Sequence, residues 1–382
     1  MAGTCPAGSW STCTTSLFAA AFDPVHLELT SPPVQVVERV ISNTTSGTGM
    51  FAVSTSGALL YVPPAPAAIR NRSIEWMDRS GKTSSLRPAP ADWRNLRFGP
   101  DGRTVAYDIF DGKQTDVWVN DWSRDRLTRL TTSTTFSMMP VWTPDGRRIV
   151  FASQRGEKAI NPTFNLYWQR ADRTGDVQRL TDSTNLQWPG SWHPSGKFLA
   201  FQEQRSLLFN LMLLPMNGDE TLGWRPATPT VLFGSAFDQR APAFSPDGRW
   251  LAYESNQSGL FEVYVRPLQG PGGQWQISTG GGLFPTRSRT RRELLYSTFE
   301  RIMVTPYAME RNAFHAEQPR PLAEARYTSR GLEGRRFDLH PDGNRLALAV
   351  LRDTEAVAKL DRLMIILNYS DELRRRAAST KR

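Results

Sequence analysis

The chain has 382 residues, of which 39% are hydrophobic and 10% aromatic, so it can bury a large core and is not a disordered polymer. Its 28 Gly and 27 Pro are typical of a fold in which many short strands are joined by turns. The net charge of +9 comes from basic residues spread along the chain, which argues against a nucleic-acid binder with its concentrated basic stripe.

The N-terminal residues 1–16 predict an irregular stretch that contains both cysteines, Cys5 and Cys13. They cannot hold the body of the fold together, and they leave the redox compartment open. No apolar run is long enough to cross a bilayer, and Met1–Ala21 lacks the basic and apolar regions of a signal peptide. We therefore expect no membrane span in this chain.

A first hairpin is expected from Leu17–Phe22 and Pro33–Val40, and it parallels Met303–Tyr307 followed by Pro319–Glu324 later in the chain. Each pair looks like the outer half of a four-stranded unit. The N-terminal hairpin has no inner half before it, which suggests that the chain is a truncated piece of a longer protein.

A repeated motif then organises the rest of the chain. A large apolar residue precedes a Pro-Asp-Gly-type turn, and a short apolar run follows it; the clear copies are Phe98–Tyr107, Trp142–Phe151, Trp192–Phe201, Phe244–Tyr253 and Leu339–Leu348. Two weaker copies are Val53–Tyr61 and Ser288–Tyr296. The glycine or its equivalent falls at positions 57, 102, 146, 196, 248, 291 and 343, a period that matches one blade of a β-propeller.

The chemistry of the turn explains the motif. Proline fixes φ at the first central position, aspartate bonds to the local backbone, and glycine supplies a positive φ before the next strand. We therefore assign a structural role in these turns to Pro100, Asp101, Gly102, Pro144, Asp145, Gly146, Pro194, Gly196, Pro246, Asp247, Gly248, Pro341, Asp342 and Gly343. The repetition of the aspartates argues against a metal or acid–base role.

Each period has room for two further strands, such as Asp116–Val119 and Leu127–Thr131, and shows no long helical pattern. The sequence therefore predicts an all-β fold: a seven-bladed propeller of four-stranded antiparallel blades over residues 17–369, with a six-bladed ring as the alternative. Closure is expected from Val34–Val40 and Leu363–Leu367, added to the strands of the last motif. Residues 370–382 predict a short basic helix and tail, capped by Ser370.

The run Phe244–Gly259, followed by Glu262–Pro267 and Trp275–Gly282, resembles the TolB-like, WD-type propeller repeats of bacteria. It is most similar to the propeller that follows the membrane anchor of many bacterial serine/threonine kinases. The resemblance covers nearly everything after about residue 17 and implies an extracytoplasmic sensor or a scaffold that binds proteins. It brings no catalytic residue, and it implies the periplasmic side of the membrane.

The sequence lacks the motifs of the catalytic domains that accompany propellers. The kinase Gly-rich loop, His-Arg-Asp and Asp-Phe-Gly motifs, and the Gly-x-Ser-x-Gly elbow of propeller peptidases, do not occur in the sequence. His26, His193, His315 and His340 form no zinc motif. His193 and His340 take equivalent places before the turn proline, where we expect two solvated turn residues in preference to a pH-sensitive pair.

Arginines replace the expected turn in the sixth copy, at Arg287, Arg289, Arg291 and Arg292. They are either a patch for an acidic partner or a drifted turn with solvated charges.

The sequence as a whole predicts a noncatalytic, monomeric propeller that binds a protein, peptide or glycan and needs no cofactor. The alternatives are the sensor portion of a truncated transmembrane serine/threonine kinase and, more weakly, a propeller hydrolase.

Overall fold

A computed structural model describes the chain between residues 17 and 369, apart from gaps at 21, 24, 27, 31–32, 39, 41, 44–47, 55, 64–71, 133–134, 157–162, 207, 271–272, 299, 311–312, 324–333 and 352–362. The chain divides into two compact units. The larger unit comprises Ile69–Gly156 and Thr163–Arg352, and the smaller unit holds the remainder. The range 17–369, expected as one propeller, is thus divided between the two units.

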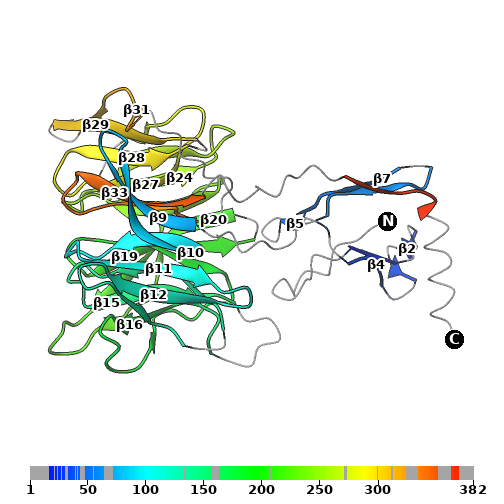
Figure 1. Ribbon diagram of the computed structural model, residues 1–382, viewed down its shortest axis with the longest axis horizontal. Coiled ribbons are helices and arrows are strands. Elements are labelled where there is room, and N and C mark those ends of the chain that lie inside the picture. Colours follow the sequence, from blue (N-terminus) through cyan, green and yellow to red (C-terminus); the bar gives the residue numbers. More distant parts are fainter. Residues whose placement is uncertain are drawn as a thin grey trace. The chain divides into compact units, whose positions relative to one another are not determined.

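The described strands of the larger unit form six antiparallel blades around a ring (Figure 1). Blade 1 is the second part of β10 (Thr83–Phe98), β11 (Thr104–Phe110), β12 (Thr115–Asp121) and β13 (Arg126–Arg129); blade 2 is β14 (Ser137–Trp142), β15 (Arg148–Ser153), β16 (Asn165–Arg170) and β17 (Gln178–Arg179); blade 3 is β18 (Gln187–Trp192), β19 (Phe198–Arg205), β20 (Leu208–Asn217), β21 (Arg225–Pro226) and β22 (Thr230–Phe233). Blade 4 is β23 (Gln239–Phe244), β24 (Trp250–Ser255), β25 (Glu262–Pro267) and β26 (Trp275–Gln276); blade 5 is β27 (Leu283–Arg287), β28 (Glu293–Ser297), β29 (Ile302–Glu310), β30 (Ala313–Ala316) and β31 (Arg320–Pro321); blade 6 is β32 (Phe337–Leu339), β33 (Arg345–Leu351), β9 (Arg72–Asp78) and the first part of β10.

Blade 6 closes the ring with strands from both ends of the larger unit. β33 pairs with β9 over seven residue pairs, from Arg345 opposite Asp78 to Leu351 opposite Arg72. β10 then serves two blades, because its first part pairs with β9 and its second part pairs with β11. Mixing strands from both ends of the unit in one blade closes the ring and leaves only short, protected strand edges.

Apolar cores lie between the blades. Among the described residues, six clusters of buried side chains each join two neighbouring blades. The cluster at the closure joins Ile74 and Ala347 of blade 6 to Trp93, Phe98 and Tyr107 of blade 1. Burying a side chain of this size contributes about 2 kcal/mol, so each interface is a substantial part of the ring's stability.

A β-bulge in the inner strand of several blades creates a second kind of link. The bulge leaves a residue in the left-handed region with an N–H that the sheet does not pair. A polar side chain from the second strand of the preceding blade accepts this N–H: Asp108 accepts from Met139 (φ 57°) at 3.1 Å, Gln202 accepts from Ala241 (φ 48°) at 2.7 Å, and Glu254 accepts from Phe284 (φ 54°). The buried polar atoms are thereby satisfied and consecutive blades are tied together.

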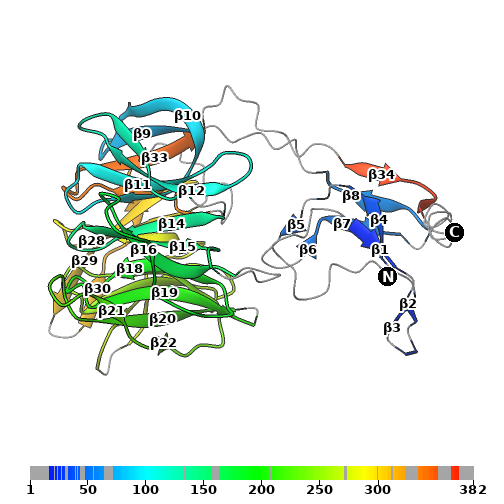
Figure 2. The ribbon, with the colours of Figure 1, turned by 90° about the horizontal axis from the view of Figure 1, so that it is seen from below.

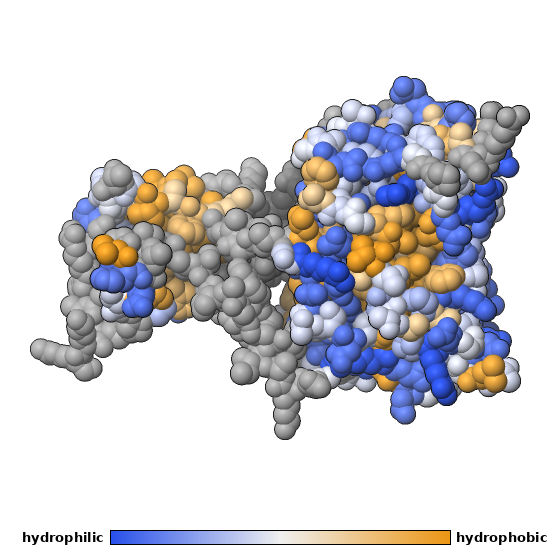
Figure 3. Space-filling model, turned by 180° about the vertical axis from the view of Figure 1, so that it is seen from behind, coloured by the Kyte–Doolittle hydropathy of each residue, from blue (hydrophilic) through white to orange (hydrophobic). Residues whose placement is uncertain are grey.

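The smaller unit contains short strands with a core of its own (Figure 2). β7 (Phe51–Val53), β8 (Leu59–Tyr61) and β34 (Met364–Ile366) form one sheet, and β1 (Leu17–Ala19) pairs with β4 (Val34–Val37); β2 (Phe22–Asp23) pairs with β3 (Glu28–Leu29), and β5 (Ser42–Asn43) with β6 (Thr48–Gly49). Several apolar side chains on this unit are exposed, among them Leu363, Met364 and Ile365, and Figure 3 shows apolar surface on it.

These pairings correct the expected closure. The ring has six blades, the alternative count, because the motif copy at Val53–Tyr61 lies in the smaller unit. One blade does join strands far apart in the sequence, but they come from the two ends of the larger unit, and the expected closing segments were wrong: β34 pairs with β8, and Val34–Val37 pairs with β1. The helix expected after Ser370 lies outside the described residues. In the part that the structure describes, no helix has the length and apolarity to traverse a bilayer.

Candidate functional site: the turn face and the central cavity

The Pro-Asp-Gly turns all lie at one end of the ring, which we call the turn face. Each glycine of the clear copies has φ between 66° and 73°, a conformation that other residues adopt only with strain. Each turn aspartate accepts the N–H of the residue two positions later: Asp101 from Arg103 at 2.9 Å, Asp145 from Arg147 at 3.0 Å, Asp247 from Arg249 at 3.1 Å and Asp342 from Asn344 at 2.8 Å. These carboxylates therefore hold the turns.

The two turn histidines differ from the expectation of solvated residues, because each reaches the turn of the next blade. His340 is buried, its Nε2 lies 2.9 Å from the carbonyl oxygen of Gly102, and its Nδ1 lies 2.9 Å from a carboxylate oxygen of Asp342. His193 packs against Gly248 in the same way, and burial lowers the pKa of its imidazole. Both histidines thus link neighbouring blades at the turn face.

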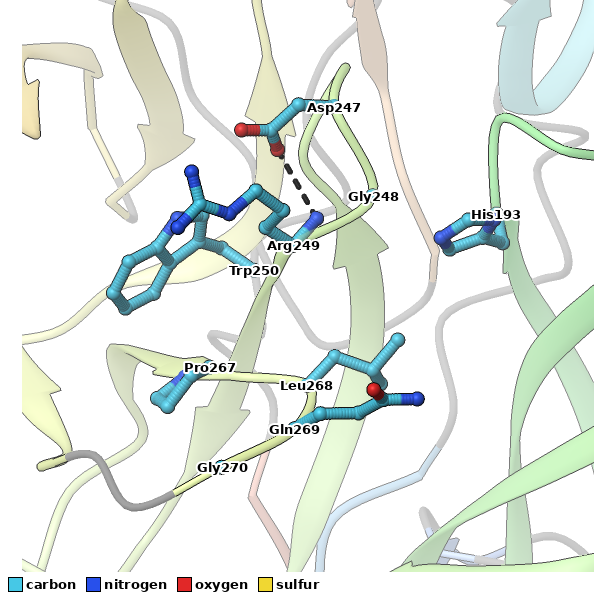
Figure 4. Close-up of a pocket in the computed structure, with 9 residues that line it drawn as sticks. All are labelled: His193, Asp247, Gly248, Arg249, Trp250, Pro267, Leu268, Gln269 and Gly270. Carbon is cyan, nitrogen blue, oxygen red and sulfur yellow. Dashed lines mark hydrogen bonds between the residues drawn. The ribbon is translucent and has the colours of Figure 1, made fainter. Parts of the chain in front are cut away.

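A shallow cavity of about 330 Å³ opens beside His193 (Figure 4). His193 lies on one side of it, and Asp247, Arg249 and Trp250 of blade 4 lie on the other, with Leu268 below. The Asp247 carboxylate is already engaged by the Arg249 N–H. This cavity therefore offers contact area at the blade 3–blade 4 junction, with its acidic group committed to the turn.

The arginines of the sixth copy do not form one patch. Arg287 is buried and stacks on the rings of Tyr307 and Phe314, with its guanidinium carbon 5.5 and 5.8 Å from their centroids. Burial lowers the pKa of this guanidinium. It occupies the place of the large apolar residue of the other copies, and it packs between strands.

Arg289, Arg291 and Arg292 are exposed on the turn face. Arg289 reaches blade 1, where its Nη1 donates to the Pro100 carbonyl at 3.4 Å, and Arg291 donates to Asn344 at 2.9 Å. These three arginines are therefore the exposed part of the expected patch.

A second cavity, of about 450 Å³, lies at the centre of the turn face. Residues from the inner strand or the following turn of all six blades line it, among them Phe98, Trp142, Trp192, Phe244, Pro285 and Asp338. It is the mouth of the ring's central channel. Its volume falls in the range of ligand-binding pockets, and its aromatic and proline walls with a few charged groups match the usual character of such pockets.

The charges in this cavity are mainly positive. Arg97, Arg287, Arg289 and Arg335 line it, and Asp338 is the carboxylate among its lining residues. Arg97 reaches across the mouth to donate to the Gly190 carbonyl at 3.3 Å. Asp338 lies 3.8 Å from Arg335 and also accepts the Phe98 N–H at 2.8 Å.

Burial lowers the pKa of the Arg97 guanidinium, and Asp338 opposes that effect. Burial also lowers the pKa of Arg335, with a further contribution from nearby Arg97. Arg97 and Arg335 thus share the Asp338 carboxylate, and Arg335 also lies near the buried carboxyl group of Glu254.

Arg97, Arg335 and Asp338 are not among the residues predicted from the sequence. A signal was present for two of them: the position before the large apolar residue is Val141, Ser191, Ala243 or Thr286 in other copies, but Arg97 and Asp338 in the second and last. A charge at a position that is small or apolar elsewhere in a repeat marks a place where one blade departs from the structural pattern. No group of three metal-ligating side chains is found among the residues that the structure describes.

Comparisons with known proteins support the fold. No family model matches the chain, and a search of curated proteins finds no match. Among solved structures, one assigned as TolB from Agrobacterium tumefaciens is 18% identical, covers 74% of this chain and 98% of its own, and has a TM-score of 0.53. TolB from Acinetobacter baumannii is 15% identical over 75% of this chain and 65% of its own, with a TM-score of 0.47. A nidogen/laminin complex is 10% identical over 67% and 88%, with a TM-score of 0.48.

At these identities the likeness concerns the fold alone. The chain has the fold of a TolB-like β-propeller.

Proposed function

We propose that the larger unit is a noncatalytic binding module and that a protein or peptide partner docks on its turn face, over the central cavity. The observation that carries this proposal is the 450 Å³ cavity to which all six blades contribute. A ring of rigid blades holds this surface in one shape, and preorganised surfaces lose little conformational entropy on binding.

The charge of the turn face favours an acidic partner. Arg289, Arg291 and Arg292 are exposed there, and Arg289 also lines the cavity. Arginine binds carboxylates through a planar fork of donors, which makes it effective in recognition of acidic peptides.

A selection from a random linear peptide library tests this proposal. We expect the purified protein to enrich acidic peptides, and we expect Arg289→Glu to weaken their binding about tenfold in fluorescence anisotropy. Lys113→Glu is the matched control, because Lys113 is exposed in the β11–β12 connection at the opposite end of the blade and the charge change is the same. Failure to enrich any peptide, or equal losses in both variants, would contradict docking on the turn face.

The absence of catalysis is part of the same proposal. We expect the purified protein to release no product from a range of ester, peptide and glycoside substrates. A hydrolytic activity that stays with the protein through successive purification steps would overturn this part of the proposal.

A sensor role in a serine/threonine kinase system is a more specific form of this proposal. The likeness of Phe244–Gly259 to the repeats of kinase-associated propellers favours it. A kinase reading frame directly upstream in the genome is the expected finding, and an unrelated neighbourhood would count against this form while leaving the binding role in place.

A further inference from the structure

The lining of the central cavity holds four arginines, Arg97, Arg287, Arg289 and Arg335, and one carboxylate, Asp338. Arg97 comes from β10 in blade 1, and Arg335 directly precedes β32 in blade 6, so both flank the blade 6–blade 1 closure. Asp338 is the carboxylate that both of them face, and Glu254 is a second carboxyl group near Arg335. An unbalanced buried charge is costly, and an incoming anion relieves that cost.

The Arg335 side chain is 4% exposed and is held in place. Its Nη1 donates to the Thr286 hydroxyl, and its Nη2 donates to the Pro285 carbonyl at 2.9 Å. Its Nε is buried and has no hydrogen-bond partner in the described part of the chain. Several other arginine Nε atoms in the described part of the chain share this state, so it supports a ligand only together with the place of Arg335 in the cavity wall.

Arg97 is less tightly held. It is half-buried, and its contact with the Gly190 carbonyl, at 3.3 Å, is longer than a usual N–H···O bond. Its guanidinium therefore has donors available for a stronger, charged acceptor.

The walls indicate what carries the anion. The cavity is larger than a bare inorganic ion requires, and Pro242, Pro285, Trp142 and Trp192 give it apolar surface beside the charges. It opens on the turn face, where Arg289, Arg291 and Arg292 are exposed. A carboxylate attached to a peptide fits this combination of charge, apolar contact and access.

We propose that Arg97 and Arg335 form a subsite that binds a carboxylate of an acidic peptide inserted into the central cavity. This inference rests on the proposed binding function of the turn face and names the group that enters the channel. Asp338 acts as the positioning residue, because it attracts both guanidinium groups and is itself fixed by the Phe98 N–H.

The test measures binding of three probes to the full chain: N-terminally labelled tetraglutamate, labelled tetraglutamine with an amidated C-terminus, and inorganic phosphate as a competitor. We expect tetraglutamate to bind and tetraglutamine not to bind. We expect Arg97→Gln and Arg335→Gln each to weaken tetraglutamate binding about tenfold or more, and Lys113→Glu to change it less than about twofold. Melting curves report whether each variant is folded. If Arg335→Gln does not fold, the binding of tetraglutamate to Arg97→Gln decides the test.

The outcomes separate the two proposals. Binding that is weakened by Arg289→Glu but unchanged in both inner variants would overturn the inner subsite and leave docking on the turn face in place. Equal binding of tetraglutamine would overturn the carboxylate claim. Phosphate that displaces tetraglutamate at equal concentration would show a site for a bare anion and overturn the peptide claim. No binding of tetraglutamate, together with no peptide from the library, would overturn both proposals.

Discussion

Glu254→Gln should make the propeller more stable at neutral and alkaline pH. Glu254 is buried in β24, and its carboxylate accepts the N–H of Phe284 in the next blade. Burial raises its pKa to about 7, although the nearby Arg240 and Arg335 lower it somewhat. Glutamine keeps the acceptor and has no charge to bury, and Gln202 performs the same task one blade earlier, where it accepts from Ala241 at 2.7 Å.

The sign and size of the effect follow from proton linkage. A carboxyl whose pKa is raised by folding binds more protons in the native state, so stability falls as pH rises between the ordinary value of 4.5 and about 7. The difference between these two values corresponds to about 3 kcal/mol, at about 1.4 kcal/mol for each tenfold change in proton affinity. The wild-type chain should lose this amount on going from below pH 4.5 to above pH 7, and Glu254→Gln should not.

Urea unfolding monitored by Trp fluorescence at pH 4.5, 6 and 8 measures the difference. We expect the two proteins to be alike at the lowest pH and Glu254→Gln to be more stable by up to about 3 kcal/mol at the highest. The converse change, Gln202→Glu, should destabilise the chain increasingly as pH rises. A gap between Glu254→Gln and wild type that does not vary with pH would refute the reasoning, as would a wild type that gains stability over the variant towards pH 8.

Two further predictions concern the ring. Ser73 and Val350 lie opposite each other in β9 and β33, and antiparallel partners have a Cα separation that suits a disulfide. In a chain whose native cysteines are replaced by serine, Ser73→Cys and Val350→Cys should therefore form a disulfide. Free thiols that remain under oxidising conditions, counted by mass spectrometry, would mean that β9 does not close the ring. Gly196→Ala should lower the free energy of unfolding by about 1 kcal/mol, because its φ is 73° and an added Cβ meets no neighbour. Gly248→Ala should lower it by at least about 2 kcal/mol, because φ is the same and the added Cβ would lie 2.1 Å from Nε2 of His193. Equal losses of melting temperature in the two alanine variants would show that the contact between blades is not as described.

The turns were predictable because their information is local. Proline, aspartate and glycine at fixed offsets encode a hairpin within six residues, and Pro246–Gly248 forms the same turn in the structure as Pro100–Gly102. An apolar run follows each turn, as in Trp250–Tyr253, because the second strand of a blade is covered on both faces.

The partner of each closing strand was not predictable from such patterns. β9 follows β8 in the chain, and β34 follows β33, so chain order favours those neighbours. The structure exchanges them: β33 pairs with β9, and β8 pairs with β34. β8, β33 and β34 are mainly apolar and β9 alternates polar and apolar residues, and this pattern does not specify which strand lies beside which.

The central site escaped the sequence analysis for a related reason. Arg97 and Asp338 lie far apart in the chain and meet only because the ring brings the last blade beside the first. The arginine cluster that the sequence did single out is divided by the fold, since Arg287 packs on aromatic rings while Arg289 faces the cavity mouth.

Amide hydrogen exchange with and without bound tetraglutamate tests the central claim, that the channel mouth is the binding site, most directly. Protection should appear in the inner strands and turns that line the cavity, at Arg97–Phe98, Ser191–Trp192 and Asp338–His340, and not in the β11–β12 connection around Lys113. Protection confined to the opposite end of the blades, or to the outer strands, would contradict the account.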